Sequence, residues 1–108
     1  EAGFRLMKVK LGYGVDDDIR VMAHIAEAVD CSQVRFMVDT NHAYGRAEAM
    51  RLGRALEPYD LGWYEEPVVP EDLTSYAALR GNLSMPIAGG ENEHGLFGFN
   101  THLTDSII

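Results

Sequence analysis

The stretch Trp63-Tyr64-Glu65-Glu66-Pro67 is a short apolar run that ends in two carboxylates and a proline. Proline cannot donate to a β-ladder and restricts the backbone of the residue before it, so a strand through this run should end there. We therefore expect a carboxylate at the exit of a strand.

Acidic residues recur at a fixed distance on either side of this stretch. Asp39 lies 26 residues before Glu65, and Glu91 lies 26 residues after it (positions 39, 65 and 91). Each also closes an apolar run, over residues 34–39 and 86–91. A repeat of this size holds one strand, one loop and one helix, which is the unit of a parallel α/β barrel. Because the carboxyl ends of parallel strands meet at one mouth, we expect the three acids to converge there.

The rest of the chain alternates between predicted strands and helices. Strands are expected at residues 4–11, 34–39, 61–65 and 86–90, with a further strand beginning at 105–108, and helices at about 16–30, 45–56, 72–83 and 93–103. The acidic run 16–18 is expected to cap the first helix, and Asp72 the third. Such alternation predicts an α/β fold with parallel strands and external helices. We predict about half of a parallel (β/α) TIM-type barrel, roughly four βα units, over residues 1–108.

The first predicted strand carries two lysines on one face. Lys8 and Lys10 stand two residues apart and point the same way, whereas Met7, Val9 and Leu11 point the other way. In a barrel the outer face is covered by helices, so the lysines are expected inside, toward the mouth. A solvated edge strand, on which lysines protect against aggregation, is the alternative.

Length, composition and charge narrow the class of protein. The chain has 108 residues, whereas a closed barrel has roughly 250, so we expect a fragment of a longer protein. Its 46% apolar and 24% charged residues are ordinary for a globular protein, and no apolar run predicts a membrane span. The net charge of −8 argues against a nucleic-acid partner. Cys31 is the single cysteine, which excludes an intrachain disulfide and favours a reducing, cytoplasmic location.

Three carboxylates at one mouth suit a hard divalent cation, and Mg²⁺ is the natural choice. A metal held in this way can bind an acidic substrate and stabilise the charge that develops on it. A lysine has an unperturbed pKa of about 10.4, but a second lysine and a cation nearby lower that pKa. The lysine pair therefore predicts a general base that removes a proton from the carbon beside a carboxylate, giving an enediolate.

Four motifs, in this order and spacing, resemble the enolase superfamily in its mandelate racemase/muconate lactonizing branch: Lys8-Val9-Lys10, Val38-Asp39-Thr40-Asn41, Trp63-Tyr64-Glu65-Glu66-Pro67 and Gly90-Glu91-Asn92. Enzymes of this superfamily are known to use a lysine or histidine base with Mg²⁺ on an enediolate. The resemblance implies part of the catalytic barrel domain, without the N-terminal capping domain and the later barrel strands of the full enzymes.

The resemblance also implies a role for each residue of the expected site. It makes Lys10 the base on one face of a small carboxylate substrate and Lys8 the neighbour that lowers the pKa of Lys10. It places Asn41 and His42 against the substrate. The stretch 39–44 is similar to a loop of acid-sugar dehydratases and sugar-lactone cycloisomerases, and dehydration is the expected reaction. Racemisation or epimerisation, and sugar-lactone cycloisomerisation, are the alternatives within the superfamily.

The resemblance makes Asp39, Glu65 and Glu91 the metal ligands. Strand parity alone leaves Glu65 and Glu66 open, because adjacent residues face opposite sides of a strand. The family pattern selects Glu65.

Interpretations of other classes have less support from the sequence. A non-catalytic α/β module, whose acids are helix caps and solvated strand ends, gives no reason for the equal spacing of the three acids. A phosphate-binding barrel would need a glycine-rich loop after late strands. The full-length parent is expected to be a homo-oligomer, and the isolated chain to be inactive. His24 is expected to be a surface or flank residue of the first helix. His94 and His102 are either additional ligands or acids, or polar surface groups, and are left unassigned.

Overall fold

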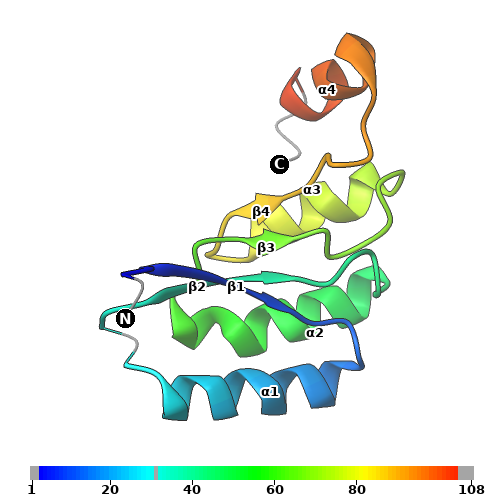
Figure 1. The fold of residues 1–108 in the computed structure, drawn as a ribbon. Helices are drawn as coiled ribbons and strands as arrows, with labels where there is room; N and C mark the ends of the chain where they lie inside the picture. The colour runs from blue at the N-terminus through cyan, green and yellow to red at the C-terminus, as the bar shows by residue number, and fades with distance from the viewer. Residues whose placement is uncertain (1–2, 31, 105–108) are drawn as a thin grey trace.

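The computed structural model describes residues 3–30 and 32–104, so Cys31 and the strand expected to begin at 105–108 lie outside the described residues. Strands and helices alternate along this part of the chain, as predicted (Figure 1). The elements in order are β1 (Leu6–Lys10), α1 (Val15–Ala28), β2 (Arg35–Asp39), α2 (Arg46–Leu56), the 3₁₀ helix η1 (Glu57–Tyr59), β3 (Tyr64–Glu65), α3 (Leu73–Asn82), β4 (Ile87–Ala88) and α4 (Gly95–Thr104).

The four strands form one parallel sheet in the order β1-β2-β3-β4. Helices α1, α2 and α3 lie along one face of this sheet (Figure 1). Consecutive parallel strands joined by helices on one side are the arrangement of a (β/α) barrel wall. The predicted α/β class and the four βα units are therefore confirmed.

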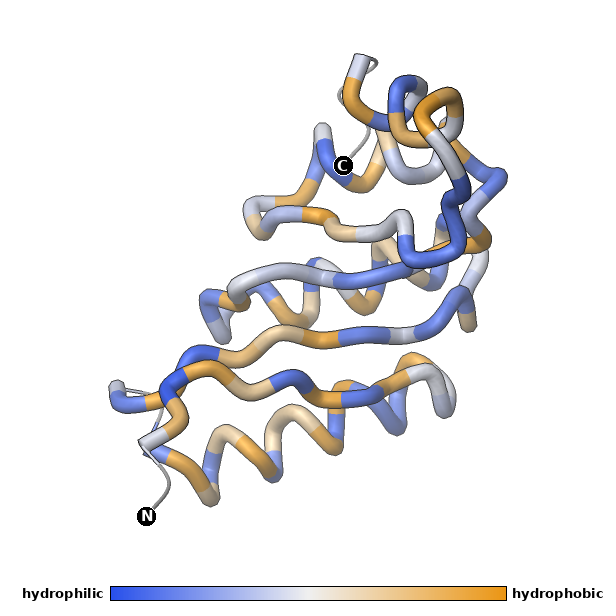
Figure 2. The backbone as a smooth tube through the Cα atoms, turned by 45° about the horizontal axis from the view of Figure 1, so that its top comes forward, coloured by the Kyte–Doolittle hydropathy of each residue, from blue (hydrophilic) through white to orange (hydrophobic). Residues whose placement is uncertain are grey.

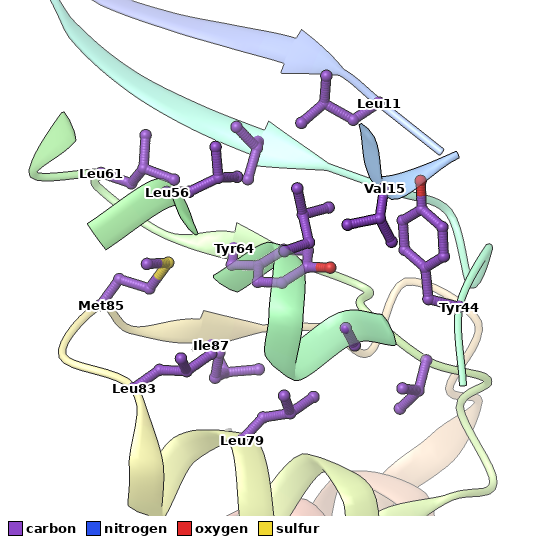
Figure 3. Close-up of a cluster of buried hydrophobic side chains, with 14 of the residues drawn as sticks. Leu11, Val15, Tyr44, Leu56, Leu61, Tyr64, Leu79, Leu83, Met85 and Ile87 are labelled. Carbon is purple, nitrogen blue, oxygen red and sulfur yellow. The ribbon is translucent and has the colours of Figure 1, made fainter. Parts of the chain in front are cut away.

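The core lies between the sheet and the helices. Tyr64 is 0% exposed and sits among aliphatic side chains that include Leu56, Leu79 and Ile87 (Figure 3). Both β3 and β4 are only two residues long, shorter than predicted. Backbone hydrogen bonds nevertheless continue the ladder before β3, from Gly62 to Phe36 at 2.7 Å, so the chain runs beside β2 there without regular strand geometry.

Hydrophilic and hydrophobic residues alternate along β1 (Figure 2). Val9 and Leu11 pack against the core beneath the sheet. Lys8 and Lys10 reach carboxylates on neighbouring strands instead of lying under a helix. The prediction that the lysines and the apolar residues of β1 face opposite sides of the sheet is therefore confirmed, and the lysines are not merely solvated groups on an edge strand.

The acidic run at residues 16–18 does not cap the first helix, so that expectation was wrong. The N-cap residue is Gly14, which has no side chain to accept a hydrogen bond and adopts a φ of 120°. Asp16 and Asp17 lie in the first turn and form surface ion pairs, Asp16 with Arg51 at 2.7 Å. Their negative charge still favours the helix N-terminus.

Asp18, the third acid of that run, is 0% exposed and holds the loop after β1. Its carboxylate accepts hydrogen bonds from the backbone N–H groups of Gly12, at 2.8 Å, and Tyr13, at 3.2 Å. It also accepts one from the hydroxyl of Tyr44, in the loop after β2. Asp18 therefore joins the loop after β1, which follows Lys10 directly, to the loop after β2.

The later helices form where the sequence predicts them. Asp72 caps α3 and accepts a hydrogen bond from the Ser75 N–H at 3.0 Å, as expected. His102 on α4, which the sequence leaves unassigned, is 3% exposed and therefore not a surface group; its ring nitrogen lies 3.1 Å from the Glu93 carboxylate in the preceding loop. No helix in the described ranges has the length and apolar character needed to cross a membrane.

Candidate functional site

The carboxyl edge of the sheet brings most of the predicted site residues together. Lys10, Asp39 and Glu65 are the last residues of β1, β2 and β3, and the register pairs Lys10 with Asp39 and Asp39 with Glu65. Glu65 pairs in turn with Ala88, the last residue of β4. Glu91 follows β4 after two glycines.

Lys8 connects two of the predicted metal ligands. Its Nζ lies 2.9 and 3.0 Å from the two Glu65 carboxylate oxygens and 3.2 Å from Asp39 Oδ2. The indole N–H of Trp63 also donates to Glu65, at 2.9 Å. The Glu65 side chain is therefore held on the same face of the sheet as the two lysines.

Lys10, two residues after Lys8 on the same face of β1, contacts the Asp39 carboxylate. Its ammonium donates to Asp39 Oδ2 and to Asn41 Oδ1, the latter at 2.8 Å. Asp39 itself is 0% exposed and also accepts from the Asn41 backbone N–H at 3.0 Å. The predicted base and a predicted substrate contact are therefore neighbours in the structure.

The charges at this edge shift the titration of two groups. Burial raises the pKa of the Asp39 carboxyl, but hydrogen bonds from Lys10, the Asn41 N–H and Lys8 outweigh it, so the pKa is lowered overall. The pKa of Lys8 is raised, first by its hydrogen bond to Glu65. Carboxylates therefore dominate around Lys8. The lowering expected from the lysine pair concerns Lys10, the expected base, so the rise at Lys8 does not test it. The lowering expected beside a bound cation stays a prediction.

Glu91 lies near this cluster but is not part of it. It is exposed and lines a pocket of about 240 Å³ together with Trp63, Glu65, Glu66 and the end of β4. Within residues 3–30 and 32–104, no group of three or more His, Cys, Asp or Glu side chains lies close enough to hold a metal ion. The structure therefore brings Asp39 and Glu65 together, but does not bring Glu91 to them.

The residues present fit a hard cation. Asp39 and Glu65 both lie within 3.2 Å of one ammonium, so oxygen atoms already surround a positive charge at this point. Carboxylate oxygens are the ligands that Mg²⁺ prefers, and the described cluster offers no thiolate for a softer metal. The structure brings the Asp39 and Glu65 carboxylates together, and the assignment of Asp39, Glu65 and Glu91 as metal ligands stays a prediction.

Glu66, the second acid of the strand exit, faces a different set of partners. It is 1% exposed and accepts hydrogen bonds from the side-chain amides of Asn41 and Asn92, both at 3.3 Å. His42 Nε2 lies 2.8 Å from its carboxylate. Burial raises the pKa of Glu66, and the charge of His42 opposes that rise. Glu66 therefore lies among amide and imidazole groups, whereas Glu65 lies with Asp39 at the two lysines. The choice of Glu65 as the metal ligand stays a prediction.

Sequence reasoning missed three residues of this site: Trp63, Glu66 as a buried hydrogen-bond acceptor, and Asn92. Trp63 and Glu66 flank Glu65, and Asn92 follows Glu91 directly. Their positions beside expected ligands were the signal available in the sequence. Their contacts, however, cross between loops and follow no local pattern.

Comparisons with known proteins agree with the fold and identify the family. Over residues 1–108 the sequence matches the family described as enolase C-terminal domain-like. D-galactarolactone cycloisomerase from Agrobacterium fabrum is 45% identical over 96 residues, which cover 89% of this chain and 25% of that protein. Other relatives are named as dehydratases and as an epimerase. The chain thus spans about a quarter of the length of the curated relatives that it matches.

Solved structures show the same similarity. The 3,6-anhydro-D-galactonate cycloisomerase from Zobellia galactanivorans superposes with a TM-score of 0.94 at 40% identity, covering 98% of this chain and 30% of that one. A racemase from Streptomyces coelicolor with bound magnesium superposes with a TM-score of 0.91 at 36% identity, with the same coverage of both chains. Bound magnesium in this and other relatives confirms the expected cofactor at the level of the family. Because a match over the whole chain and the superposed structures agree with the four motifs, the chain belongs to the enolase superfamily, in its mandelate racemase/muconate lactonizing branch.

Proposed function

We propose that the longer protein to which this chain belongs, called the full-length protein below, removes the proton beside the carboxylate of an acid sugar and then eliminates water. The observation that carries this proposal is the lysine–carboxylate cluster at the barrel mouth. There the Lys10 ammonium contacts Asp39, and Lys8 joins Asp39 to Glu65. A base beside a cation site is what proton abstraction next to a carboxylate requires.

The residues of the cluster divide the work between them. When bound, Mg²⁺ supplies positive charge that stabilises the charge developing on the substrate carboxylate. Asp39 and Glu65 would hold it, with Glu91 as the third ligand. Lys10 takes the proton from carbon, for which its side chain must first be neutral. Asn41 donates or accepts hydrogen bonds at the edge of the same site.

A second candidate is sugar-lactone cycloisomerisation. It is favoured by the 45% identity to D-galactarolactone cycloisomerase and by the 40% identity to the Zobellia enzyme. The abstraction by Lys10 is common to both candidates. They differ in whether the oxygen that leaves the substrate departs as water or stays attached as part of a ring-opened or rearranged product.

Calorimetric titration of Mg²⁺ tests the metal site. Replacing Glu65 by glutamine in the full-length protein removes a negative charge beside the cation, which is expected to weaken binding by about 3 kcal/mol or more, roughly a hundredfold. Glu57→Gln is the matched control, because Glu57 accepts a hydrogen bond from the Ser84 N–H, away from the strand exits. Equal Mg²⁺ affinity in wild type and Glu65→Gln would reject Glu65 as a ligand.

Deuterium exchange tests the reaction. In D₂O, the full-length protein with Mg²⁺ is expected to place deuterium on the carbon beside the carboxylate of unreacted galactarate or its lactone. After elimination that carbon becomes a carbonyl carbon, so the product should carry deuterium on the next carbon, and EDTA should stop both kinds of labelling. The products, followed by NMR, separate dehydration from cycloisomerisation. The isolated 108-residue chain is expected to give no labelling, and Mg²⁺-dependent labelling by it would contradict that expectation. The cytoplasmic location and the homo-oligomeric parent stay predictions.

A further inference from the structure

Glu66 is a buried carboxylate that the proposed reaction does not use. It is 1% exposed, and its φ of 46° lies in the left-handed region, as do those of Asn41 (44°) and His42 (64°). Non-glycine residues in this region cost free energy and persist where surrounding contacts hold them. Three such residues in two adjacent mouth loops call for contacts that hold both loops.

Glu66 provides those contacts through its backbone and its side chain. Its carbonyl oxygen accepts hydrogen bonds from the His42 N–H at 2.9 Å and from the Thr40 hydroxyl at 3.0 Å. Its own N–H donates to Ala88 on β4 at 2.9 Å. Its carboxylate reaches Asn92 in the loop after β4. The loops after β2, β3 and β4 are therefore joined at one residue.

The carboxylate also decides which way the Asn41 amide faces. An ammonium can only donate hydrogen bonds, and an ionised carboxylate can only accept them. Asn41 lies between one of each, since its Oδ1 accepts from Lys10 at 2.8 Å and its Nδ2 donates to Glu66 at 3.3 Å. A flipped amide would place donor against donor and acceptor against acceptor. Glu66 therefore holds the amide oxygen toward the lysine.

We propose that Glu66 is a positioning residue, which acts on the proton transfer by fixing the Asn41 amide and, through that amide, the ammonium of Lys10. The proposal rests on the proposed function, in which Lys10 is the base. In this proposal Glu66 is neither a metal ligand nor the base. The end of β3 therefore carries two adjacent carboxylates with different roles. Glu65 belongs to the lysine–carboxylate cluster, and Glu66 holds the loop that carries Asn41.

A mutant cycle in the full-length protein tests the path through Asn41. Glu66→Met removes both acceptor oxygens at similar length and is expected to lower kcat for deuterium exchange about a hundredfold, the scale of a misplaced catalytic group. Glu66→Gln keeps one acceptor and should lie between Met and wild type. In an Asn41→Ala background, either substitution should lower kcat by less than about twofold further, while Mg²⁺ affinity stays unchanged. Effects of Glu66 and Asn41 variants that multiply would overturn the proposal.

Two further measurements separate positioning from loss of structure and from failure of the proposed function. Glu57→Met, which removes a carboxylate far from the mouth, should leave kcat unchanged. A crystal structure of Glu66→Met should show the Asn41 amide turned away from Lys10. Glu66→Gln, the milder change if Glu66→Met does not fold, should show the amide in two orientations, one of them turned away from Lys10. An amide in its original place would overturn the proposal even if wild type shows no exchange. A wild type without exchange, but with a turned amide in the variant, would overturn the proposed function and retain the role of Glu66 in placing Lys10.

Discussion

Replacing Asp18 by alanine is expected to destabilise the barrel domain by about 3.5–4 kcal/mol, an estimate built from three lost hydrogen bonds. The Asp18 carboxylate is 0% exposed and accepts from the N–H groups of Gly12 and Tyr13 and from the hydroxyl of Tyr44. Alanine has no acceptor to offer, so all three donors lose their partner. The loop that they hold follows Lys10 directly.

The three donors do not contribute equally. Water can replace the carboxylate at Gly12, which is half-buried, and at Tyr13, which is exposed, so each of these N–H groups costs about 1 kcal/mol. Tyr44 is buried, and its hydroxyl therefore costs more, about 1.5–2 kcal/mol. Asp18→Asn keeps one acceptor oxygen in place and is expected to cost about half as much as alanine.

Urea unfolding of the full-length protein measures this effect, and amide hydrogen exchange over residues 11–15 locates it. Asp17→Ala is the matched control, because Asp17 neighbours Asp18 but forms only an exposed ion pair with Arg20, for which less than about 0.5 kcal/mol is expected. Faster exchange should be confined to the Asp18 variants. The reasoning fails if Asp18→Ala and Asp17→Ala have the same free energy of unfolding, or if exchange at Gly12 is unchanged.

Three other predictions concern neighbouring parts of the mouth. Burial, and then the hydrogen bond to Asp18, raise the pKa of Tyr44 from 10.0 to about 12. The folded state is therefore stabilised below pH 10 and loses this contribution as the pH rises to about 12. Urea unfolding across this range should show a smaller fall in the free energy of unfolding for Tyr44→Phe than for wild type. Gly12→Ala is expected to lower the free energy of unfolding by about 2 kcal/mol or more, because the φ of Gly12 is 106° and a Cβ there would lie 2.8 Å from the Thr40 carbonyl oxygen. Gly81 has open space around it, so Gly81→Ala should instead stabilise α3 by up to about 1 kcal/mol. Thermal unfolding measures both effects. Lys10→Met should lower deuterium exchange at least about a hundredfold, and exchange at the wild-type rate would reject Lys10 as the base.

Local patterns in the chain predicted the order of the elements and most of the site. Apolar runs that end in an acid, repeated every 26 residues, indicate one βα unit each, because burial of one face and the exit of a strand are recorded in neighbouring residues. The lysine pair on β1 follows from the two-residue period of a strand, and its contacts with Asp39 and Glu65 bear that out. The resemblance selected Glu65 over Glu66, where strand parity left both open.

The tasks of Glu66, Asp18 and His102 depended on contacts between segments far apart in the chain. Asp18 looks like a helix cap in sequence, yet its hydroxyl partner Tyr44 comes from a loop 26 residues away. Glu66 turns away from the lysines because its backbone is left-handed and its donors come from the loops after β2 and β4. Residue type and spacing describe which side of a strand or helix a group faces. They do not describe which polar groups from other loops arrive to satisfy a buried charge, because that depends on how the loops pack across the end of the sheet.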